Sequence, residues 1–137
     1  MAQRASFIGI GTLSRTTGCN IETIRYYEKI GLMPAPGRSA GGHRAYDDAH
    51  TKRLSFIVRC RRLGFTTKEI RRLLTLADTD APHCAEVKSV TETHLAEVRN
   101  KIADLRKLER RLAQMVKSCG ATQKPGCPVI DELFTAA

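Results

Sequence analysis

Residues 10–31, which read IGTLSRTTGCNIETIRYYEKIG, contain two short amphipathic stretches separated by a tight turn. Asn20 is a favourable N-cap for the second stretch, and Gly31 suits the position just after a helix, where the backbone often turns left-handed. The pattern therefore predicts a helix over residues 10–17, a turn at residues 18–20 and a second helix over residues 21–30.

The second of these helices carries side chains that suit a nucleic acid. Ile24 falls on the side that we expect to pack inward, whereas Thr23, Arg25 and Tyr26 offer hydroxyl and guanidinium groups. Such groups on an exposed helix are donors for phosphate oxygens and base edges. We therefore expect a recognition helix, with Thr23, Arg25 and Tyr26 as its DNA contacts.

Residues 32–46 are too rich in proline and glycine to form a helix. We expect short extended pieces around residues 32–33 and 44–46, which would pair as a small β-hairpin, or wing. An ordinary connecting hairpin is the alternative for such a loop. The cations and the hydroxyl that a wing would bring to the DNA backbone belong to Arg38, His43, Arg44 and Tyr46.

The next two helices are expected to form a second pair. A stretch from Asp47 to about Leu63 has apolar residues on one side and mostly basic residues on the other. Thr66 then opens a short helix as the N-cap of a capping box, with Glu69 as its acidic partner.

The charge of the chain is divided unevenly. Residues 1–72 hold 14 of the 23 lysines and arginines but only 5 of the 14 aspartates and glutamates, so the whole net charge of +9 lies there. Neutralisation of phosphates by lysine and arginine supplies most non-specific affinity for nucleic acids. The basic half therefore indicates a polyanion as partner, with a merely solvated basic surface as the alternative.

Nothing in the sequence indicates a membrane, a secretory route or an enzyme. No apolar run approaches the roughly 20 residues that span a bilayer, and residues 1–7 lack a secretory signal. We therefore expect a cytoplasmic protein whose five cysteines stay reduced. The sequence shows no paired carboxylates, no Ser-His-Asp set and no phosphate-cradling loop, so we expect no catalysis.

After a polar hinge at residues 77–82, residues 83–117 contain neither proline nor glycine. Apolar residues recur there at intervals of three or four, which predicts one helix roughly 50 Å long with an apolar seam. Little chain follows that could cover this seam, so we expect a second copy to cover it in an antiparallel or parallel homodimer. Packing of the seam back on the N-terminal domain is the alternative. The seam consists of Leu95, Val98, Ile102, Leu105, Leu108, Leu112 and Met115.

Two thiols follow the long helix directly. Cys119 and Cys127 are separated by seven residues with two glycines and a proline, which suits a tight loop closing on a soft ion such as Hg(II), Cu(I), Cd(II), Zn(II) or Pb(II). Cys84 lies at the opposite end of the helix, but an antiparallel partner would bring it beside the other chain's pair. We expect these three thiols to be the metal ligands. Cys19 and Cys60 are expected to be buried packing residues.

Together these segments resemble the MerR family of bacterial transcription regulators. Residues 8–11 (IGIG) and 23–32 (TIRYYEKIGL) are similar to the family's helix-turn-helix, and residues 42–46 (GHRAY) to its wing. Residues 61–70 (RRLGFTTKEI) resemble its second helix pair, and the remainder resembles its antiparallel dimerisation helix and metal loop.

The resemblance implies a dimer on a palindromic operator within a promoter, where metal binding untwists and bends the DNA so that RNA polymerase can use it. Family members that sense doubly charged ions carry cysteine at the start of the dimerisation helix, where this chain has Cys84. Three thiolates suit Hg(II) best, ahead of Cd(II), Pb(II) and Zn(II), while the loop length keeps Cu(I) as an alternative. The DNA contacts that the resemblance implies are Arg25, Tyr26, Arg44 and Tyr46.

We thus expect a mainly α-helical chain. Its parts are a winged helix-turn-helix DNA-binding domain with a second helix pair (1–76), a hinge (77–82), a long antiparallel dimerisation helix (83–118), and a metal-binding loop with a short C-terminal helix (119–137). The rival interpretation is a thiol-based redox sensor on the same scaffold, in which the two loop cysteines form a disulfide.

Overall fold

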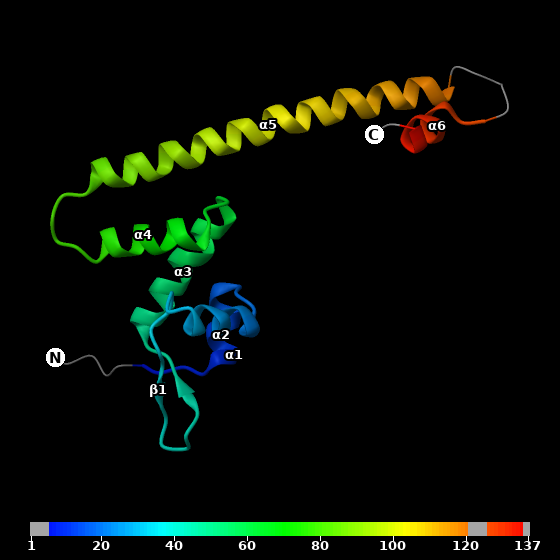
Figure 1. Cartoon of the computed structure of the whole chain (residues 1–137). Helices are drawn as coiled ribbons and strands as arrows, with labels where there is room; N and C mark the ends of the chain where they lie inside the picture. Colours follow the sequence, from blue (N-terminus) through cyan, green and yellow to red (C-terminus); the bar gives the residue numbers. More distant parts are fainter. Residues whose placement is uncertain (1–5, 121–125, 136–137) are drawn as a thin grey trace. The chain divides into compact units, whose positions relative to one another are not determined.

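A computed structural model describes residues 6–120 and 126–135 of the chain, which form two units, Met1–Val90 and Thr91–Ala137. The order of elements confirms a mainly helical fold with a small two-stranded wing (Figure 1). In the first unit these are α1 (Ile10–Thr17), α2 (Ile21–Lys29), β1 (Gly37–Arg38), β2 (Arg44–Ala45), α3 (Asp48–Arg62) and α4 (Thr67–Ala77). α5 (Cys84–Gly120) starts in the first unit and continues into the second, which also holds α6 (Pro128–Thr135).

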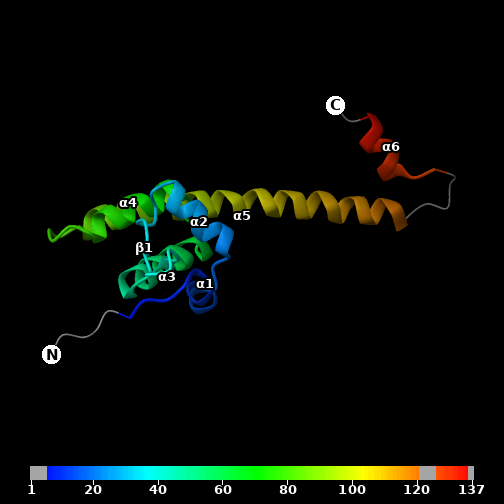
Figure 2. The same cartoon turned by 90° about the horizontal axis from the view of Figure 1, so that it is seen from below.

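The first unit is built around one apolar core. Each of its helices contributes at least one side chain without exposed surface, and burial of each is worth about 1.5–3 kcal/mol. Figures 1 and 2 show α1 and α2 beside α3, and Figure 1 shows the wing extending away from these helices. The core residues in question include Leu13, Ile24, Ile57 and Ile70.

The ends of α2 form as the sequence predicts. The side chain of Asn20 accepts a hydrogen bond from the backbone N–H of Glu22 at 2.8 Å, which confirms the N-cap. At the other end Gly31 has a φ of 77°. The N–H of Leu32 donates to the carbonyl of Tyr27 at 2.9 Å, so the helix closes in a Schellman motif.

The first strand of the wing is not where the sequence pattern places it. Leu32 and Met33 both donate their N–H groups to the Tyr27 carbonyl, and their side chains are buried in the core. These residues therefore complete the end of α2, and the prediction of an extended piece there is wrong. The strands pair antiparallel in the register Gly37 with Ala45 and Arg38 with Arg44.

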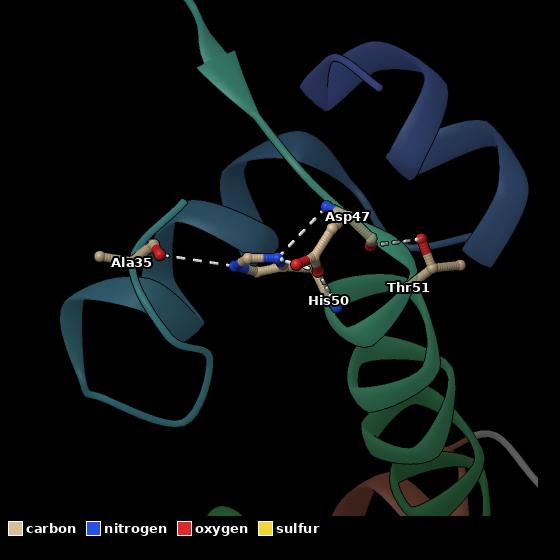
Figure 3. A network of polar contacts seen from close by, with 4 residues as sticks. All are labelled: Ala35, Asp47, His50 and Thr51. Atoms are coloured by element: carbon tan, nitrogen blue, oxygen red, sulfur yellow. Dashed lines mark hydrogen bonds and ion pairs between the residues drawn. The ribbon is translucent and has the colours of Figure 1, made fainter. Parts of the chain in front are cut away.

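α3 begins with a capping box built on a histidine. The carboxylate of Asp47 accepts from the N–H of His50 at 2.9 Å, and Nδ1 of His50 faces the N–H of Asp47 at 3.3 Å. Figure 3 shows the His50 ring between Asp47 and Ala35, whose carbonyl lies 3.4 Å from Nε2, and the Thr51 hydroxyl donating to the Asp47 carbonyl. The backbone N–H of His50 and then its ring Nδ1, which lies 2.7 Å from Oδ1 of Asp47, lower the pKa of the Asp47 carboxyl.

α5 is a single helix of 37 residues, about 55 Å long at 1.5 Å per residue. Its apolar seam is exposed within the chain, with Leu105 63% and Leu112 59% exposed. α6 is joined to α5 by an ion pair between Arg111 and Glu132. None of the helices in the described part of the chain is long and apolar enough to cross a membrane.

Candidate functional site

α2 presents a polar outer face. Arg25 is exposed and Tyr26 is 52% exposed, whereas Ile24 and Tyr27 are buried against the core. Thr23 is half-buried. The structure thus leaves the Arg25 guanidinium and the Tyr26 hydroxyl accessible to a ligand that approaches this face.

The wing adds cations beside this helix. Arg38 and His43 are exposed, and Arg44 is half-buried. Arg38 and Arg44 lie directly opposite each other across the two strands, which brings two positive charges together on the wing. Nη1 of Arg38 donates to the carbonyl of Gly42 at 3.2 Å. The wing therefore concentrates positive charge that suits an anionic partner.

Tyr46 lies inside the fold rather than on its surface. Its side chain has no exposed surface, and its hydroxyl donates to Oε1 of Glu28 at 2.5 Å. Burial, followed by this hydrogen bond, raises the pKa of Tyr46 to about 12. Oε2 of Glu28 in turn lies 3.2 Å from Nη1 of Arg44. Sequence reasoning missed Glu28; the available signal was an acidic residue on a helix otherwise suited to phosphates.

Two arginines hold the C-terminal end of α2. Nε of Arg53, on α3, donates to the carbonyl of Leu32 at 2.9 Å, and its Nη1 lies 3.4 Å from Asp78. Nη2 of Arg71, on α4, donates to the carbonyl of Ile30 at 2.6 Å. Cations at a helix C-terminus stabilise the last carbonyl groups. The position of α2 is therefore tied to both helices of the second pair.

The last turn of α5 and the start of α6 bring two thiols together. The sulfur atoms of Cys119 and Cys127 are 3.5 Å apart. Two thiolates about 2.3 Å from one tetrahedral ion would be about 3.8 Å apart, so this pair fits a shared ion after a small adjustment. The predicted loop between them passes through residues 121–125, which lie outside the described residues.

The two thiols differ in acidity. The backbone N–H of Ile130, at the start of α6, and the thiol of Cys119 both hydrogen-bond to the Cys127 sulfur and lower the pKa of that thiol. The same sulfur–sulfur contact raises the pKa of Cys119. Cys127 is therefore the thiol of the pair that ionises more readily, and thiolates are the form that binds metal.

The other three cysteines have separate positions. Cys84 is exposed as the first residue of α5, about 50 Å along the helix from Cys119, so one chain does not bring them together. Cys19 and Cys60 are buried, and burial raises the pKa of both thiols, which confirms them as packing residues. Beside Cys84, Nδ1 of His83 lies 2.8 Å from the Ala81 carbonyl.

The sequence matches a known family over most of its length. Residues 9–76 match "MerR HTH family regulatory protein", and residues 51–115 match "MerR, DNA binding". The chain is 38% identical over 134 residues to the mercuric resistance operon regulatory protein of Serratia marcescens, an alignment that covers 97% of this chain and 92% of that protein.

Solved structures agree with this match. The transcription regulator PbrR691 from Ralstonia metallidurans CH34, in complex with lead(II), is 42% identical with a TM-score of 0.78, covering 92% of this chain and 98% of that one. The dual function regulator MerR from Bacillus megaterium MB1, in complex with mercury(II), is 35% identical with a TM-score of 0.71, covering 93% and 99%. The chain therefore belongs to the MerR family of helix-turn-helix transcriptional regulators, in a metal-sensing branch.

Proposed function

We propose that this regulator binds promoter DNA as a homodimer and activates transcription in response to a soft divalent ion, with Hg(II) as the first choice. The observation that carries the proposal is the pair of accessible sulfur atoms 3.5 Å apart at the junction of α5 and α6. Two thiolates held this close can chelate one ion. Thiolate sulfur binds soft ions in preference to Mg²⁺ or Ca²⁺. Relatives named for mercuric resistance, or solved with mercury(II) and lead(II), support the same class of ion.

DNA binding is assigned to residues 1–76, which carry the recognition helix and the wing. On α2 the exposed face offers Arg25 and Tyr26 to the DNA, with the half-buried Thr23 at its edge. The wing offers its cations to the phosphates; these belong to Arg38, His43 and Arg44. Tyr46 contributes by holding the wing in place, since its hydroxyl is bonded to Glu28.

The metal site is proposed to be completed across a dimer. The seam of α5 is exposed, and a second copy packed antiparallel along residues 83–118 would cover it. That arrangement places Cys84 of the partner subunit beside Cys119 and Cys127. The bound ion supplies a cross-link among the three thiolates. Because Cys84 is the first residue of α5, this link acts on the hinge, residues 77–82, that leads to the DNA-binding helices.

The proposed consequence is a change in the DNA rather than a chemical reaction. With the thiolates linked, the two DNA-binding halves hold the promoter untwisted and bent, and RNA polymerase can then use it. Distorting DNA costs free energy, which contacts between the protein and the distorted DNA offset. Because these contacts would differ between the ion-free and ion-bound dimers, one dimer can favour two different DNA shapes. The protein is not expected to be an enzyme, and its free thiols suit the reducing cytoplasm.

Three thiolates match the preference of Hg(II) better than that of Zn(II), which usually takes four ligands. Cd(II), Pb(II) and Zn(II) are the next choices. Zn(II) would need a fourth ligand, which would be either a water or His83, whose Nδ1 lies 2.8 Å from the Ala81 carbonyl.

Native mass spectrometry of the reduced protein under anaerobic conditions tests the proposal. Hg(II), Cd(II), Pb(II), Zn(II) and Cu(I) are offered separately in competition with a small thiol. We expect the dimer to retain Hg(II), and we expect Cys119→Ser, Cys127→Ser and Cys84→Ser each to lose it. Cys19→Ala is the matched control, because its thiol is buried elsewhere. Retention of Cu(I) alone, independent of Cys84, would indicate a copper sensor. A disulfide between Cys119 and Cys127 with no retained ion would indicate a redox sensor.

A further inference from the structure

Glu28 is an acidic residue enclosed within the basic surface. Its side chain is only 10% exposed, and each carboxylate oxygen faces a different residue at the end of the wing. Oε1 accepts the Tyr46 hydroxyl at 2.5 Å, and Oε2 lies 3.2 Å from Nη1 of Arg44. Among the residues that the structure describes, this side-chain hydrogen bond and this ion pair join α2 to residues 37–46, while the Tyr46 ring also packs in the core that holds Ile24.

Both partners depend on the charge of Glu28. A buried carboxylate is costly unless it is paired, and Tyr46 and Arg44 supply that pairing. Nη1 of Arg44 is buried and has no hydrogen bond, so the nearby negative charge is its compensation. That charge also offsets the repulsion between Arg44 and Arg38 across the two strands.

We propose that Glu28 is a positioning residue of the DNA-binding surface: its carboxylate holds the wing against α2 and aims the Arg44 guanidinium at the DNA backbone. The proposal rests on the proposed function, in which α2 and the wing bind DNA together. Two contacts on one rigid surface bind more tightly than the same contacts on parts that move independently, because less freedom is lost on binding. The contribution of the wing therefore depends on Glu28, although we place Glu28 itself in no DNA contact.

The sign of the effect separates this role from plain electrostatics. Removing a negative charge from a DNA-binding surface strengthens binding if only net charge matters. Glu22 lies on the same helix and is exposed, and its side chain makes no hydrogen bond or ion pair within the described residues. We expect Glu22→Gln to bind DNA as tightly as the wild type or more tightly. Glu28→Gln removes the same charge but should bind about tenfold more weakly, because it loses a charged contact.

The experiment uses a DNA duplex that the full-length wild-type protein selects from a random-sequence pool. Affinity is measured by fluorescence anisotropy over a series of salt concentrations. Log affinity falls as log salt rises, and each lost phosphate contact makes this slope less steep by about 0.9. We expect Arg44→Gln and Glu28→Gln to make the slope less steep to a similar extent. The double variant should match Arg44→Gln alone, since an unaimed or absent guanidinium has the same effect.

Several results would overturn the proposal. One is that Glu28→Gln binds DNA as tightly as the wild type. Another is that the affinity losses of Glu28→Gln and Arg44→Gln add fully in the double variant. If Glu28→Gln does not fold, Tyr46→Phe takes its place: it keeps the ring in the core and removes one donor to the carboxylate. A folded Tyr46→Phe protein with wild-type affinity also overturns the proposal. If the wild type selects no duplex, the proposed function itself fails and this inference falls with it.

Discussion

Replacing Arg53 by methionine tests how the C-terminal end of α2 is held. Arg53 makes two contacts of unequal value: Nε donates to the carbonyl of Leu32, a residue with no exposed surface, and Nη1 faces Asp78, whose side chain is 67% exposed. A hydrogen bond from a charged donor is worth about 1.5–3 kcal/mol, and a buried carbonyl left without one is destabilised. An exposed ion pair contributes about 1 kcal/mol at most.

Arg53→Met should therefore lower the free energy of unfolding by about 2 kcal/mol, whereas Asp78→Asn should lower it by about 1 kcal/mol at most. At about 4 °C per kcal/mol for a chain of this size, the expected change in Tm is about 8 °C for Arg53→Met. Thermal unfolding is followed by circular dichroism at one fixed protomer concentration, because dimer stability depends on concentration. Arg72→Met, which removes an exposed arginine of α4, is the control. Equal stability of Arg53→Met and wild type, or equal losses in Arg53→Met and Asp78→Asn, would show that the bond to the Leu32 carbonyl does not hold the end of α2.

The pKa of Tyr46 is raised to about 12 in the folded protein, so its hydroxyl stabilises the fold fully below pH 10, the ordinary tyrosine pKa, and loses that contribution as the pH rises towards 12. An ultraviolet titration of the tyrosines should lose its highest-pH step in Tyr46→Phe. An unchanged titration would contradict this assignment. Cys127, whose pKa is lowered, should react with iodoacetamide before Cys119 in a peptide-mapped time course, and the reverse order would be inconsistent with the contact to the Ile130 N–H. Arg25→Ala should weaken binding to the selected duplex by about tenfold while the number of ions retained per dimer stays the same; unchanged affinity removes Arg25 from the DNA surface.

Local features of the fold were predictable because their causes lie within a few residues. Asn20 caps α2 through the N–H two positions later, and Thr66 and Glu69 form the reciprocal capping box that their spacing predicts. The box at Asp47 escaped this pattern because its third residue is a histidine, His50, rather than glutamate or glutamine.

The position of the first wing strand was predicted incorrectly for a tertiary reason. Leu32 and Met33 have the apolar character of a strand, but their side chains are buried in the core. Their N–H groups donate to the Tyr27 carbonyl at the end of α2. The strand then forms at residues 37–38, a Gly-Arg pair whose sequence carries little strand preference.

The site was predictable in its residue types but not in its contacts. The spacing of Cys119 and Cys127 indicated a loop closing on a metal, and the structure adds that their sulfurs meet. The burial of Tyr46 and its bond to Glu28, 18 positions earlier, could not be read from the sequence, because a tyrosine beside a basic wing suits a DNA contact equally well.

In the proposed mechanism, an ion bound at the thiol pair changes the shape of the bound DNA. The most direct measurement is the linking number of a relaxed plasmid carrying the selected duplex, with topoisomerase present, for protein with and without Hg(II). We expect Hg(II) to lower the linking number with the wild type and with Cys19→Ala but not with Cys119→Ser. An unchanged linking number in a wild-type complex that has taken up Hg(II), or an equal change with Cys119→Ser, would contradict it.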